Sequence, residues 1–167
     1  MKKLCLLAIA MWTVCATHAQ TEFSVPDLTL EQKLGATKAL MNRNICSCIV
    51  AAKAGGISAE EYGKKIGQQW IPVWDKNTGF EEFVGFNLWA WAVMADEVKV
   101  SEQSADKVVL VIPSVDKELE EAPALETFSI EDLVAYNDGM MQVIAAHLGY
   151  KVKLSWGDKG MTAVISK

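Results

Sequence analysis

The strongest hydrophobic pattern in the chain lies in residues 128–156. Ser129 and Asp132 form an N-cap signal, and apolar residues then recur every three or four positions as far as Leu148. Gly149 suits the left-handed conformation that often ends a helix, and the residues after it alternate between polar and apolar. This pattern predicts an amphipathic helix, a glycine stop and a half-buried strand.

Two upstream helices are predicted from capping signals of the same kind. Thr29 with Gln32 opens a helix over residues 29–53, which a pair of glycines ends. Ser58 opens a second helix, and Pro72 is expected to kink or end it because proline lacks the N–H donor and clashes with the preceding turn.

A third helix is expected after a capping box formed by Thr78 and Glu81. Residues 83–95 are apolar on every side of the helix, with Gly85 and Asn87 as the interruptions. A helix of this kind is expected to be buried on most of its sides.

The remaining segments predict strands. Residues 98–101 alternate, residues 108–112 form a continuous apolar run, and residues 161–165 follow a glycine-rich turn. We therefore predict an α+β fold in which helices pack on one face of an antiparallel sheet made from two hairpins. The acidic segment 113–127, broken by prolines, is expected to be a loop that covers a sheet edge or a pocket mouth.

The amino-terminal residues have the pattern of a secretory signal peptide. A basic start precedes a short apolar run, and small residues lead up to Ala19, so residues 1–19 are expected to be removed. The mature chain would be a single domain of residues 20–167, exported to the periplasm or secreted. A lipid anchor on Cys15 is the alternative, but the preceding Val14 is larger than that signal requires.

The charge balance argues against two classes of partner. The whole chain carries a formal net charge of −5, and loss of the basic signal segment makes it more negative. Nucleic acid and anionic membrane surfaces are therefore not expected partners. No later segment is long and apolar enough for a membrane span.

Few residues are candidates for metal or redox chemistry. Cys48 is predicted to lie on the buried stripe of its helix, and Cys46 about 200° away around it, so both are expected to be free thiols. His147 is the sole histidine after the signal segment, and a structural role is favoured over a metal, haem or acid/base role. Zinc sites need three or four ligands, so no metal is predicted, and no cofactor is strongly implied. Met140 and Met141, with the histidine and cysteines, offer a copper(I) site as an alternative to plain core packing.

The tryptophans are the best functional signal. Five of the six tryptophans follow the signal segment, and burying them all would require a partner for every indole N–H. Either these side chains are packed in the core with satisfied donors, or some of them line a pocket in which asparagine amides orient a ligand. The predicted ligand-binding residues are Trp70, Trp74, Asn87, Trp91, Asn137 and Met141.

The order of elements resembles the 4-vinyl reductase domain superfamily. The resemblance rests on the stretch YNDGMMQVIAAHLGYKVKLSW, with Gly139 in mid-helix, Gly149 before the strand and a glycine turn at residues 157–160. That group includes vesicle-tethering transport-particle subunits and a family named for L-2-amino-thiazoline-4-carboxylic acid hydrolase, with haem nitric-oxide-binding domains as distant relatives. The cysteines that many members carry near the final hairpin are missing here.

Three functions follow from these observations. The pattern favours an exported binding protein for a small apolar or aromatic molecule, held between helices and sheet. The resemblance implies two alternatives, a hydrolase of a small ring amide or thiazoline, and a homodimeric protein-interaction module. A binding protein is favoured over an enzyme, because no nucleophile, base and orienting group stand at a recognisable spacing.

Overall fold

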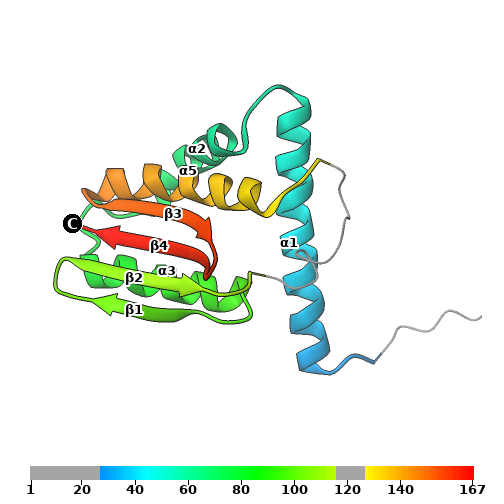
Figure 1. Ribbon diagram of the computed structural model, residues 1–167, viewed down its shortest axis with the longest axis horizontal. Helices are drawn as coiled ribbons and strands as arrows, with labels where there is room; N and C mark the ends of the chain where they lie inside the picture. Colours follow the sequence, from blue (N-terminus) through cyan, green and yellow to red (C-terminus); the bar gives the residue numbers. More distant parts are fainter. Residues whose placement is uncertain (1–26, 116–126) are drawn as a thin grey trace, which may run out of the picture.

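The computed structural model describes residues 27–115 and 127–167. Its four strands are β1 (Lys99–Gln103), β2 (Lys107–Ile112), β3 (Lys151–Gly157) and β4 (Gly160–Ser166). They form one antiparallel sheet in the order β1-β2-β4-β3 (Figure 1), so the α+β prediction is confirmed. The predicted signal peptide and most of the acidic loop lie outside the described residues.

The helices are α1 (Leu30–Ala54), α2 (Ala59–Trp70), α3 (Phe80–Met94) and α5 (Ile130–Leu148), with a 3₁₀ turn, η1 (Ile71–Val73), after α2. In Figure 1 the strands lie in front of α3, α5 runs along β3, and α1 crosses the end of the domain. The first turns of α1 extend past the body of the domain.

Local sequence signals fix three of the helix starts. Thr29, Ser58 and Ser129 each accept a hydrogen bond from the backbone three residues later, and each capping box is complete. Pro72 lies in η1, where α2 ends, and Gly149 ends α5 in the left-handed conformation. These predictions are confirmed because every one of them depends on residues within a single turn.

The main core lies between the helices and the inner face of the sheet. Alternate residues of β2, Val108, Leu110 and Ile112, are buried, as are Val152 and Leu154 of β3. They meet apolar side chains from α1, α3 and α5 in one continuous cluster. Burial of this apolar area is the main force that holds the helices on the sheet.

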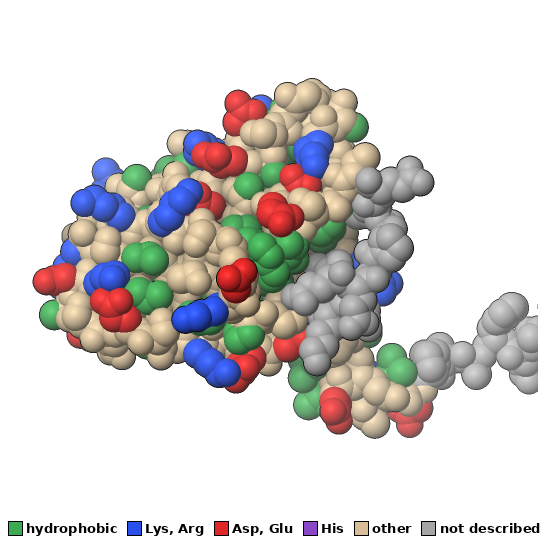
Figure 2. All heavy atoms as spheres, viewed as in Figure 1, with side chains coloured by type: hydrophobic (Ala, Val, Ile, Leu, Met, Phe, Trp, Pro, Cys, Tyr) green, Lys and Arg blue, Asp and Glu red, His purple; other side chains and the backbone are tan. Residues whose placement is uncertain are grey.

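The opposite face of the sheet is exposed and carries mixed charge. Figure 2 shows lysines and acidic residues interspersed over it. Lys107 pairs with Glu102 across the first hairpin, and Lys167 pairs with Asp106 at the end of β4. This face has no surface of a single sign that would attract a strongly charged partner.

Helices α2 and α5 approach each other through glycines. A Cβ atom on Gly63 would overlap the backbone of Tyr136, and one on Gly67 would lie 2.6 Å from the carbonyl oxygen of Met140. Gly139 of α5 faces the α2 backbone in the same way. The mid-helix glycine singled out in the sequence is therefore required by close helix packing.

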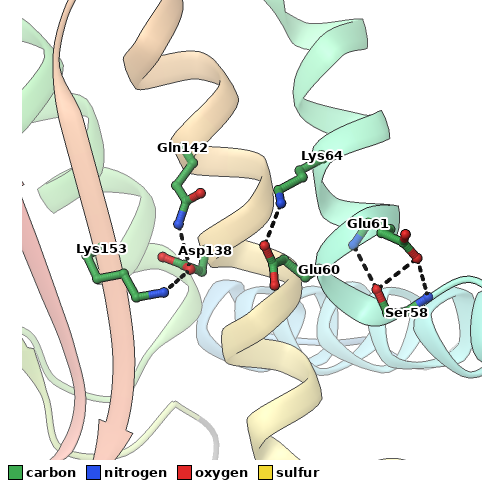
Figure 3. Close-up of polar contacts among 7 residues, drawn as sticks. All are labelled: Ser58, Glu60, Glu61, Lys64, Asp138, Gln142 and Lys153. Carbon is green, nitrogen blue, oxygen red and sulfur yellow. Dashed lines mark hydrogen bonds and ion pairs between the residues drawn. The ribbon is translucent and has the colours of Figure 1, made fainter.

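A buried carboxylate fixes α5 to the sheet. Asp138 is 3% exposed, and it accepts hydrogen bonds from Lys153 Nζ at 2.6 Å and from Gln142 Nε2 at 2.8 Å (Figure 3). It also accepts a hydrogen bond from the backbone N–H of Leu154 at 2.7 Å. Strand β3 lies at the edge of the sheet, so its outer side has no neighbouring strand to accept hydrogen bonds. Asp138 accepts the hydrogen bond of the Leu154 N–H in place of such a strand.

Two predictions about helix faces are wrong. In α1, Cys46 is fully buried and Cys48 half-buried, because the inward face follows Asn42, Ile45, Cys46 and Ile49 at helical spacing. Neither Cys46 nor Cys48 forms a disulfide within the described residues.

The second wrong prediction concerns α3, whose outer side is exposed at Phe86, Trp89 and Val93 because the helix lies at the surface of the domain. Its start also differs from the prediction. Gly79 occupies the N-cap with no side-chain bond, while the Thr78 carbonyl accepts the Tyr150 hydroxyl at 2.9 Å.

Candidate interaction surface

A chain of aromatic rings leads from the core to the surface of α3. Tyr150 stacks on Phe83, whose ring meets Trp74 edge-on with centroids 5.6 Å apart. Trp74 in turn meets Phe86 at 4.7 Å, and Phe86 meets Trp89 at 5.8 Å. Each pair has a spacing favourable for aromatic contacts, so the outer rings are held in place by the buried ones.

We call the outer part of this chain the aromatic face, formed by Trp74, Phe86, Trp89 and Val93. Trp89 is 62% exposed, Val93 45% and Phe86 40%, and the three follow one another along one side of α3. Large aromatic side chains exposed together on a surface are a common mark of an interaction site.

The start of α1 provides a second exposed apolar surface. Residues 30–37 are all exposed, and within them Leu30 is 73% and Leu34 62% exposed. Leu34 lies one turn before Lys38, which is paired with Asp96 next to α3. Leu30 lies one turn before Leu34 on the same side of the helix, and we call residues 30–37 the α1 overhang.

The six residues predicted to bind a ligand are spread over different surroundings. Trp70 is exposed at the end of α2, and Trp74 is half-buried beneath the aromatic face. Trp91 and Met141 are buried in the core.

The two asparagines of this set are also buried. The side-chain amide of Asn87 donates to the Phe83 carbonyl at 2.8 Å, and that of Asn137 donates to the Leu133 carbonyl at 2.8 Å. Each bond stays within one helix, and it satisfies a donor that was expected to orient a ligand. Of the six residues, Trp74 is the one that the structure places in the aromatic face.

Sequence analysis missed Phe86, Trp89 and the overhang leucines as surface residues. Nothing local marks them, because α3 is apolar all round and Leu30 and Leu34 fit the apolar stripe of α1. One feature of the sequence does indicate an exposed side: the third helix is apolar all round, and the chain has few other helices to pack against it.

Helices α1, α2 and α5 meet at a cluster of weakly acidic groups, Cys48, Tyr62 and Tyr136. The two tyrosine rings lie 5.6 Å apart. Burial raises the pKa of Tyr136 to about 12, with contributions from Tyr62 and Cys48. Burial and a hydrogen bond with the Cys48 thiol also raise the pKa of Tyr62. Both tyrosines therefore stay protonated at neutral pH.

Within the described residues, no group of three or more His, Cys, Asp or Glu side chains could hold a metal ion. His147 is half-buried in the last turn of α5. None of the described helices is both long and apolar enough to cross a membrane.

Comparison with known proteins adds no assignment. No protein-family model matches the chain, and no curated protein sequence matches it at a significant level. The resemblance to the 4-vinyl reductase domain superfamily stays a prediction.

Proposed function

We propose that this chain is a protein-interaction module that works as a symmetric homodimer, in which the α1 overhang of each subunit packs on the aromatic face of the other. The exposure of Trp89 beside Phe86 carries the proposal. A protein that gained nothing from this surface would not be expected to hold two large aromatic rings in water on a rigid helix.

The exposed apolar area indicates that the interface includes both the aromatic face and the α1 overhang. A fully exposed aromatic side chain offers about 200–250 Å² and a leucine or valine about 100 Å², so the aromatic face presents roughly 300 Å² and the overhang roughly 150 Å². A standard interface buries about 800 Å² per subunit, of which about 65% is apolar in homodimers, or roughly 500 Å². Neither surface reaches this value by itself, but the two together come close.

The α1 overhang is expected to be only marginally stable without a partner to pack against. A helix gains most of its stability from tertiary packing, and two turns without such packing are marginal in water even with a good cap. Leu30 and Leu34 stand on the same side of these turns, so docking would bury both and stabilise the helix end. A symmetric pair would make this contact twice.

Sedimentation velocity of the mature protein tests the proposal. We expect a dimer at micromolar concentration, and we expect Trp89→Ser and Leu34→Ser each to give monomers that remain folded. Trp70 and Leu40 serve as matched controls, because both are exposed but neither belongs to the two surfaces. Leu40 lies about 200° around α1 from Lys38. Trp70→Ser and Leu40→Ser should leave the dimer intact. A monomeric wild-type protein at 100-fold higher concentration would refute the dimer.

A mixing experiment separates reciprocal docking from other dimers. In a mixture of Trp89→Ser and Leu34→Ser, the heterodimer regains one intact contact between overhang and face, whereas either variant alone has none. The mixture should therefore form dimers more strongly than each variant alone. If instead the wild type dimerises and the mixture shows no gain, the overhang does not dock on the aromatic face.

A further inference from the structure

A groove lies between α3 and the β1–β2 hairpin. It has a volume of about 770 Å³, within the usual range for small-molecule sites. Phe80, Val84 and Leu88 form its helical wall, and Val108 of β2 contributes from the sheet. All five residues of β1 beside the groove are exposed.

Gly85 lies in the wall of this groove, in the middle of α3. A glycine inside a helix is destabilising relative to alanine, and proteins keep it where another backbone comes too close for a Cβ atom. Gly63 meets that condition, but a Cβ atom on Gly85 would have nothing within 4 Å. Helix packing therefore gives no reason for a glycine here, whereas an open groove does, since any side chain at this position would enter it.

The polar groups at the groove favour a cationic ligand group. Glu81 is exposed on the helical side of the groove, and Gln103 is exposed on the hairpin side. Within the described residues, neither side chain forms a hydrogen bond or an ion pair. The Phe80 ring already lies under one cation, the ammonium of Lys167 at 5.3 Å from its centroid. That lysine is neutralised by Asp106, so the negative charge of Glu81 is left for a ligand.

We propose that the groove binds a small amphiphile with a protonated amine, its apolar part between α3 and Val108 and its ammonium group beside Glu81. The apolar walls supply the affinity by removing hydrocarbon from water. The carboxylate of Glu81 and the amide oxygen of Gln103 accept hydrogen bonds from the ammonium group and so select for it over an anion. The residues that line the groove are not those of the aromatic face, although Gly85 lies one helical turn before Trp89.

Isothermal titration calorimetry with octylamine, below its micelle concentration, tests the site. Gly85→Leu puts a large side chain into the groove from a Cβ position that has no atom within 4 Å, and Gly85→Ala is the matched control that removes the glycine but adds a single methyl group. We expect octylamine to bind the wild type, Gly85→Ala to bind within about two-fold of it, and Gly85→Leu to lose at least ten-fold in affinity. Thermal unfolding of each variant without ligand shows that all three are folded.

The charge of the head group is tested separately. Glu81→Gln keeps the size of the side chain and removes its charge, and it should weaken octylamine binding by about two- to five-fold, the range expected for an exposed ion pair. Octanoate, with the same chain and the opposite charge, should bind more weakly than octylamine. No binding of octylamine to the wild type, or equal binding to Gly85→Leu, would overturn the site. Equal binding of octanoate would overturn the cationic preference.

Discussion

Helix α3 and the α2–α5 pair both carry glycines inside helices, in opposite surroundings. Between α2 and α5, Gly63, Gly67 and Gly139 bring two backbones into contact, and any side chain there would collide with the other helix. Gly85 of α3 faces open space. A glycine in the middle of a helix therefore has no single structural role, because its role depends on what lies opposite it.

The largest expected effect is at the glycine contact. Gly63→Ala should lower the free energy of unfolding by about 3 kcal/mol, because the new methyl group overlaps the Tyr136 carbonyl and the helices must separate. Urea unfolding followed by circular dichroism measures the loss. An unchanged midpoint would show that the two helices can move apart freely.

The buried carboxylate beside this contact comes next. Asp138→Asn should cost about 2 kcal/mol, because it removes the charge that binds Lys153 and turns one acceptor oxygen into a donor. Lys153→Met is the control and should cost less, since its side chain is largely exposed. Equal losses in the two variants would mean that the ion pair, and not the bond to the Leu154 N–H, holds α5 to β3.

Alkaline pH should weaken the same region. The folded pKa of Tyr136, about 12, lies above its ordinary value of 10, so its contribution to stability is complete below pH 10 and is lost as pH rises from 10 to 12. Unfolding midpoints measured across this window should fall, and Tyr136→Phe should flatten the fall. In a pH titration followed by absorbance near 295 nm, the tyrosine ionisation that occurs at the highest pH should be missing from that variant. If the step persists, the high pKa belongs to another tyrosine.

The smallest expected effect has the opposite sign. Gly85→Ala should raise the free energy of unfolding by up to about 1 kcal/mol, because alanine is the better helix former and its methyl group meets nothing. The same urea experiment measures it, with Gly63→Ala as the contrasting variant. A loss of stability at Gly85 would remove the distinction between the two regions.

Much of the fold was readable from the sequence because its signals are local. Thr29, Ser58 and Ser129 were identified by partners three residues away, and Gly149 by its place after the last apolar residue of α5. Alternation over the second hairpin gave β3 and β4 in the same way. The failed capping prediction at Thr78 shows the limit, since its carbonyl is tied to Tyr150, far along the chain.

The candidate surfaces were not readable in this way. The apolar pattern of α3 is the same whether Trp89 faces the core or water, and a stripe on α1 does not reveal where the neighbouring elements stop. The sequence by itself determined the elements, most of their ends and the α+β class, because caps, glycine stops and alternation act over a few residues. The tertiary structure alone decided which of two cysteines is buried, which rings are exposed and which glycines are in contact, because exposure depends on residues distant in the chain.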